Sequence, residues 1–177
     1  MNRDRGFSLL ELVVTVAVVT IVLTVGVPAF REMMQENRLR AYVNEFLAAL
    51  NLARSEAIKR GVRVSLCKSA DGANCTTAHG YEQGWIVFVD PGNPPGATTP
   101  TVDPGEAVIQ VYAALAGDVR LTGNTPVRSY VSYTPEGLSR LLNGGFQAGT
   151  LTLCAAPRAR AIIINSMGRA RVAEATC

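Results

Sequence analysis

The first sixty residues contain two hydrophobic patterns in succession. Between Phe7 and Phe30 the only charged residue is Glu11, and the nineteen residues from 12 to 30 carry no charge. A helix rises about 1.5 Å per residue, so this stretch is long enough to cross a hydrocarbon core of about 30 Å. Basic residues in the short leader, Arg3 and Arg5, favour the cytoplasmic side. We therefore expect residues 7–30 to form a membrane-crossing helix, with the rest of the chain beyond the membrane.

The second pattern, over residues 31–61, is amphipathic. Apolar side chains recur at three- and four-residue spacing, as in Leu39, Val43, Phe46 and Leu50. The pattern does not keep strict heptads, which disfavours a free-standing coiled coil. Gly61 is suited to end the helix because glycine readily adopts the left-handed conformation after a last turn. We predict one continuous helix whose second half packs on a globular domain.

Residues 62–177 change to a period of two. Short runs of β-branched and aromatic residues alternate with turn signals, and a loop rich in Pro and Gly occupies residues 91–105. Trp85 stands among aliphatic residues and is expected in the core. One long helix followed by many short strands predicts an α+β fold, with the helix packed against antiparallel sheets. The predicted strands are 62–67, 84–90, 106–115, 118–123, 127–134, 149–154, 160–165 and 169–175.

Residues 6–11, G-F-S-L-L-E, resemble the class III signal of type IV prepilins and type II secretion pseudopilins. The resemblance implies that a prepilin peptidase cuts between Gly6 and Phe7, removes the leader 1–6 and methylates the new amine of Phe7. The apolar helix is then retained in the filament core, where Glu11 is implied to set subunit register by pairing with a neighbour's N-terminal amine. From the residues alone, an uncleaved anchor with a protonated Glu11 remains an alternative.

Three further stretches resemble the FimT/FimU/GspH family of minor pilins and pseudopilins. They are L-x-x-A-R-S-E-A-I at 50–58, G-W-x-V-F-x-D at 84–90 and N-S-x-G-R-x-R at 165–171. The resemblance implies a type IV pilin-like fold, with other major and minor pilins and prepilin peptidase as partners. It also implies a single-pass inner-membrane protein with a periplasmic domain before assembly, and a location in the pilus at the cell surface afterwards.

The four cysteines are expected to form disulfides. None belongs to a C-x-x-C pair, and the single His79 is not at a zinc-ligand spacing from such a pair. An exported domain lies in an oxidising compartment, which favours disulfides. Of three possible pairings, we expect Cys67–Cys75 and Cys154–Cys177. The second would hold the C-terminus and contribute about 3 kcal/mol on the chain-entropy account.

Charge is unevenly distributed along a chain whose formal net charge is +3. Residues 69–119 contain six acids and no Lys or Arg, whereas residues 138–177 contain five Arg and one acid. Ser166-Met167-Gly168 predicts a three-residue hairpin loop with Gly168 in the left-handed conformation. With Val172 turned to the core, the two-residue period would point Arg169 and Arg171 outward.

These arginines are the candidate binding site. Arg158 and Arg160 precede the partner strand with the same spacing, so we expect all four guanidiniums at one corner, held rigid by the second disulfide. Arg contacts phosphate through a planar fork. No aromatic residue is interleaved with these arginines, so contact with the DNA backbone and little sequence preference is expected.

Three interpretations of these arginines remain open. In FimT-type minor pilins a G-R-x-R tail is associated with DNA binding in natural transformation (competence), and Gly168, Arg169 and Arg171 fill that motif. The arginines could instead bind an acidic neighbouring subunit, as in a structural FimU-like priming pilin or a GspH-like pseudopilin. They could also be a solvated surface. No catalytic triad, metal cluster, P-loop or dinucleotide motif is present in the sequence, so we expect no enzyme, metal or cofactor.

Overall fold

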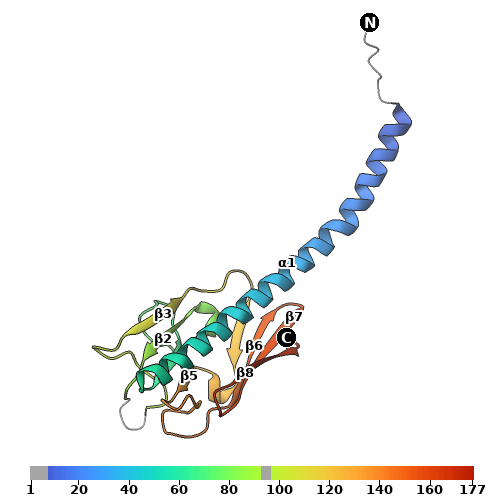
Figure 1. Cartoon of the computed structure of the whole chain (residues 1–177). Helices are drawn as coiled ribbons and strands as arrows, with labels where there is room; N and C mark the ends of the chain where they lie inside the picture. Colours follow the sequence, from blue (N-terminus) through green and yellow to red (C-terminus); the bar gives the residue numbers. More distant parts are fainter. Residues whose placement is uncertain (1–7, 93–96) are drawn as a thin grey trace. The chain divides into compact units, whose positions relative to one another are not determined.

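The computed structural model describes residues 8–92 and 97–177, so Gly6 and Phe7 lie outside the described residues. The first element is helix α1, which runs without interruption from Leu9 to Arg60 (Figure 1). The chain divides into two compact units, Met1–Arg38 and Leu39–Cys177.

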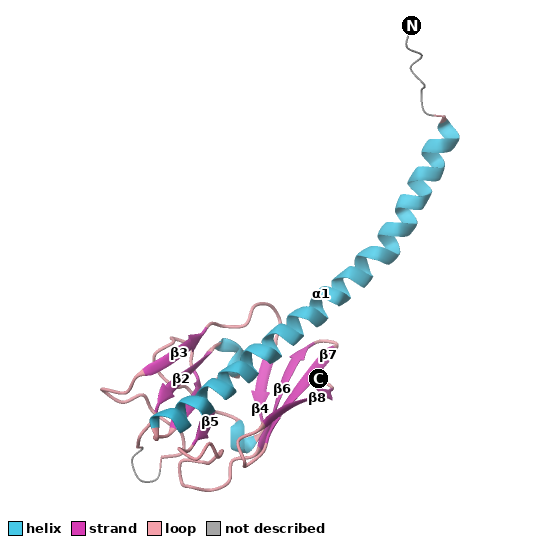
Figure 2. Ribbon diagram, in the orientation of Figure 1, coloured by secondary structure: helices cyan, strands magenta, loops and turns pink. Residues whose placement is uncertain are grey.

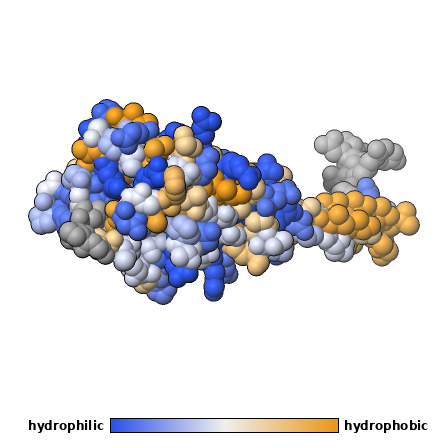
Figure 3. Space-filling model, turned by 90° about the horizontal axis from the view of Figure 1, so that it is seen from below, coloured by the Kyte–Doolittle hydropathy of each residue, from blue (hydrophilic) through white to orange (hydrophobic). Residues whose placement is uncertain are grey.

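In the first unit, α1 is long and apolar enough to cross a membrane. The helix begins where the Ser8 hydroxyl accepts a hydrogen bond from the Glu11 amide at 3.2 Å. All side chains from residue 8 to residue 35 are exposed, and Figure 3 shows the apolar ones gathered along this stretch. A helix that is apolar on all sides and exposed needs lipid or neighbouring helices around it.

In the second unit, one face of α1 enters the core. The predicted amphipathic face is confirmed, because Leu39, Val43, Phe46 and Leu50 are all buried. The helix ends as predicted at Gly61, which has φ of 67° and whose amide donates to the Ala57 carbonyl at 3.0 Å.

The predicted α+β fold is confirmed: two four-stranded antiparallel sheets pack with α1. The first sheet has the order β3-β2-β1-β5 and the second has the order β4-β6-β7-β8. In Figures 1 and 2, β2 and β3 lie on one side of the C-terminal part of α1 and β6 to β8 on the other. The strands are β1 Val64–Lys68, β2 Trp85–Val89, β3 Val108–Tyr112, β4 Arg120–Gly123, β5 Tyr130–Tyr133, β6 Gly149–Ala155, β7 Arg158–Ile164 and β8 Ala170–Ala175, with 3-10 turns at Tyr81–Gln83 and Thr125–Val127.

The core lies between α1 and the inner faces of both sheets. Trp85 is fully buried, as predicted, with its ring 5.1 Å from Phe46 and stacked on Tyr112 at 5.1 Å. Such aromatic pairs add about 1 kcal/mol each to the free energy of burial. All the buried side chains of the described residues belong to Leu39–Cys177, so this unit contains a complete core of its own.

Both predicted disulfides are present, Cys67–Cys75 and Cys154–Cys177. The loop after Cys67 is also held by the buried Lys68, whose ammonium donates to the carbonyls of Thr77 at 2.9 Å and His79 at 2.7 Å. Burial lowers the pKa of Lys68, and the nearby Glu82 partly offsets that effect.

Candidate polyanion-binding surface

The turn between β7 and β8 carries the predicted arginines. Gly168 has φ of 75° and its amide donates to the Asn165 carbonyl at 2.9 Å. The Asn165 side-chain oxygen accepts from the amides of Met167 at 3.1 Å and Arg169 at 3.0 Å. The predicted three-residue loop with a left-handed Gly168 is therefore confirmed, and the backbone of Arg169 is fixed by hydrogen bonds.

Gly168 also allows this turn to pack closely on the rest of the domain. A Cβ at this position would collide with the Gly137 carbonyl and lie 3.0 Å from the Tyr133 ring. The same Gly137 carbonyl accepts a hydrogen bond at 2.9 Å from Arg54 of α1. The Ser166 carbonyl, in the turn itself, accepts a hydrogen bond at 3.2 Å from the amide of Ser139, two residues after Gly137. Burial raises the pKa of the Tyr133 hydroxyl, so the ring beneath the turn stays neutral.

Arg54 and Gly137 support the arginine turn, a role that no local pattern in the sequence indicated. Arg54 lies in the A-R-S-E-A-I stretch, and Gly137 ends the turn sequence T-P-E-G. The contact between them joins positions 54 and 137, and no local pattern reports such a pair. The structure thus brings two of the three motif stretches, at 50–58 and 165–171, to one point.

Strand register decides which way the arginines face. Arg171 pairs with Ile163, and Val172 pairs with the buried Ile162, so Arg171 lies on the outer face of the sheet. Arg169 shares that face by alternation, and both arginines are exposed. Val172 faces the core side, as expected, although its side chain is 42% exposed. The reason is that β8 is an edge strand, with a neighbour on one side only.

Arg158 and Arg160 do not join this corner, and that expectation is wrong. Arg160 pairs in register with Glu174 and its guanidinium makes an ion pair with that carboxylate at 3.2 Å. Because side chains alternate along β7, Arg158 and Arg160 share the inner side with Ile162, opposite to Arg171. The sequence showed the matching spacing, but only the pairing register shows that the two pairs face opposite ways.

The second disulfide does not hold the arginine turn, so this expectation is also wrong. Cys154 lies in register with Ala159, which pairs with Ala175 near the other end of β8. Ala175 is four residues from Arg171, or about 13 Å along a strand. The disulfide fixes the C-terminus, whereas the contacts of Gly168 with Gly137 and Tyr133 fix the turn.

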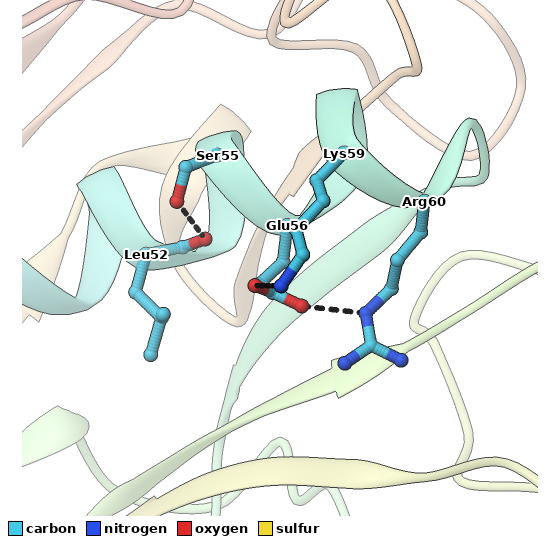
Figure 4. A network of polar contacts seen from close by, with 5 residues as sticks. All are labelled: Leu52, Ser55, Glu56, Lys59 and Arg60. Carbon is cyan, nitrogen blue, oxygen red and sulfur yellow. Dashed lines mark hydrogen bonds and ion pairs between the residues drawn. The ribbon is translucent and has the colours of Figure 1, made fainter.

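The cations at the end of α1 are already engaged, unlike Arg169 and Arg171. At the end of α1, Lys59 and Arg60 pair with Glu56 at 3.4 and 2.6 Å (Figure 4). In contrast, the guanidiniums of Arg169 and Arg171 make no hydrogen bond or ion pair with any described residue. They are available for an external anion, and the fixed backbone below them limits the conformational entropy lost on binding.

Comparison with known proteins agrees with the fold and with the N-terminal signal. The family described as type II transport protein GspH matches residues 42–168, and the prokaryotic N-terminal methylation motif matches residues 1–27. No curated protein sequence matches the chain.

Two crystal forms of the type IV minor pilin FimU of Pseudomonas aeruginosa strain PAO1 are similar in structure. In space group P21, FimU is 18% identical, with 80% of this chain and 92% of FimU covered and a TM-score of 0.56. In space group P65, FimU is 17% identical, with 76% of this chain and 92% of FimU covered and a TM-score of 0.51. At this identity the likeness supports the fold. The family match spans most of the chain and the methylation motif precedes it, so the protein belongs to the GspH family and is a minor pilin or pseudopilin, anchored in the inner membrane before incorporation into a pilus.

Proposed function

We propose that this subunit binds extracellular DNA through Arg169 and Arg171 while it is part of a pilus, for DNA uptake in natural transformation. The observation that supports the proposal is the exposed pair of unengaged guanidiniums on a turn fixed by Gly168. An arginine makes bidentate hydrogen bonds to phosphate oxygens, so each guanidinium can hold one backbone phosphate. We also propose that the chain is a substrate of prepilin peptidase at Gly6 and Phe7 rather than an enzyme itself.

The proposed contact is with the backbone and has little sequence preference. Neither Arg169 nor Arg171 has an aromatic neighbour in the pairing register, where the opposite residues are Asn165 and Ile163. Base stacking therefore has no platform beside the arginines. Binding of this kind releases counterions, so its affinity falls steeply with salt.

A second candidate function is purely structural: a FimU-like pilus subunit or a GspH-like pseudopilin whose partners are other pilins. The fully exposed apolar stretch of α1 supports such partners and is compatible with DNA binding as well. In the structural case, Arg169 and Arg171 would pair with acids of a neighbouring subunit. Isolated protein would then show no affinity for DNA.

The test is a gel shift of residues 39–177 with duplex DNA at several salt concentrations. Each phosphate contact contributes about −0.9 to the log–log salt slope, so Arg169→Ala with Arg171→Ala should make the slope shallower by about 1.8. The matched control is Arg158→Ala, an exposed arginine on the other side of the same sheet. Phosphate contacts are strong at about 50 mM salt. Absence of binding at that concentration would therefore favour the structural function.

A further inference from the structure

The middle of the outer face of the β4-β6-β7-β8 sheet is built from small side chains. Pairing registers place Thr122, Thr152, Ala161 and Ala173 in one row across the four strands. Two residues further along, Thr150 and Ile163 lead to Arg171. We name this surface, defined by these seven residues together with Arg120, the Thr/Ala face.

The Cys154–Cys177 disulfide crosses this face at the Arg120 end, over the buried Ala159. On the rest of the face the described residues form no hydrophobic layer, in contrast to the outer face of the other sheet. There, Ile86, Phe88 and Tyr130 form a second hydrophobic cluster beneath loop residues such as Val102 and Leu142. None of the residues of the Thr/Ala face belongs to either hydrophobic cluster. A well-formed sheet face without an apolar cover is available to a polar ligand.

Arg120 lies at the corner diagonal to Arg171. It begins β4, pairs with Cys154, and shares the outer face with Thr122 because Leu121 between them is buried. Its guanidinium is exposed and, among the described residues, has no hydrogen-bond or ion-pair partner. Three strand spacings of about 4.8 Å and four residues of about 3.3 Å separate the two arginines, or about 20 Å in all.

We infer that the Thr/Ala face is the DNA footprint, that Arg120 is its second anchor, and that the ligand is duplex DNA. The inference rests on the proposed function. Small side chains let a bulky backbone approach the sheet, and threonine hydroxyls can donate to phosphate oxygens. A span of about 20 Å corresponds to about six nucleotide steps of 3.4 Å, so one straight duplex reaches both corners. The face has no aromatic side chain on which a single strand would stack.

Two acids, Glu82 and Asp118, line with Arg120 a hollow of about 680 Å³ beside the sheet. The Glu82 carboxylate accepts hydrogen bonds from the amides of Gly80 and Leu121, whereas Asp118 is exposed and precedes Arg120 by two residues. A carboxylate there repels phosphate and weakens the contact made by Arg120. This gives the inference a prediction of opposite sign: Asp118→Asn should tighten binding a few-fold.

The experiment measures affinity and salt slope for residues 39–177, a unit that contains a complete core, on a duplex of about 20 base pairs. Arg120→Ala should weaken binding about tenfold near 50 mM salt and make the slope shallower by about 0.9. Thr152→Glu, which puts a negative charge in the middle of the face, should weaken it further. Arg158→Ala removes the same charge on the other side of the sheet and should change neither quantity.

The outcomes separate this inference from the proposed function. If Arg169→Ala with Arg171→Ala abolishes binding while Arg120→Ala matches Arg158→Ala, the footprint is wrong and the proposed function stands. If a single strand of the same length competes as well as the duplex, the assignment of duplex DNA is overturned. Wild-type protein that does not bind removes both proposals. Circular dichroism spectra and melting temperatures of all variants establish that each is folded.

Discussion

Replacing Gly168 with alanine should damage both the stability of the domain and the position of the arginines. The left-handed φ of 75° costs a residue with a Cβ about 1–2 kcal/mol. The new Cβ also collides with the Gly137 carbonyl and lies 3.0 Å from Tyr133. Overpacking of this kind costs about 1–3 kcal/mol, because neither a backbone carbonyl nor a buried ring moves easily. The expected loss in the free energy of unfolding is thus about 2–5 kcal/mol.

Gly144→Ala is the matched control. Gly144 has φ of 83°, and a Cβ there would meet no atom within 4 Å. It therefore carries the same backbone strain without the collision and should lose only about 1–2 kcal/mol. Urea unfolding of residues 39–177, followed by circular dichroism, measures both variants and gives the difference that belongs to packing.

The same pair of variants tests whether the turn positions the arginines. Under conditions in which both variants are folded, Gly168→Ala should bind duplex DNA more weakly than Gly144→Ala, although no arginine has been changed. Equal losses of stability would refute the argument that Gly168 is required by the close approach of Gly137. Equal DNA affinities would show that the turn does not need this support to bind.

Three other predictions concern the second disulfide, Asp71 and the N-terminus. Replacing Cys154 and Cys177 with serine should lower the free energy of unfolding by about 3 kcal/mol in urea. It should leave unchanged the loss of DNA affinity caused by Arg169→Ala with Arg171→Ala, because the disulfide lies at the far end of β8 from the turn; a smaller loss in the serine variant would contradict this. Hydrogen bonds from Asn74 and the Ala73 amide lower the pKa of Asp71 below its usual 3.8, so stabilisation present above that value is lost as the pH falls. In thermal melts, Asp71→Asn should therefore be less stable than wild type at about pH 6 and closer to wild type in stability at about pH 2. A difference in stability that does not change with pH would argue against the lowered pKa of Asp71. Mass spectrometry of assembled protein should find methylated Phe7 as the first residue. A chain that still carries residues 1–6 would exclude cleavage between Gly6 and Phe7.

Local chemistry in the sequence determined much of this protein. The apolar run, the amphipathic continuation of α1 and its end at Gly61 follow from patterns within a few residues of one another. So do the left-handed Gly168 and the presence of Arg169 and Arg171 on one face, since helices and hairpins are defined by short-range periodicity. Both expected disulfides are present, and the oxidising compartment was the ground for expecting disulfides at all.

Only the tertiary structure decided which of these residues meet. Arg160 faces Glu174 and not Arg169, because the register of β7 against β8 sets the side on which each residue lies. Arg120 becomes a diagonal partner of Arg171 because β4 pairs with β6, a neighbour that its own sequence does not specify. The carbonyl of Gly137 joins Arg54 to the arginine turn over long distances in the chain. Strand order and register are set by packing between segments far apart in sequence, and local propensities carry no record of them.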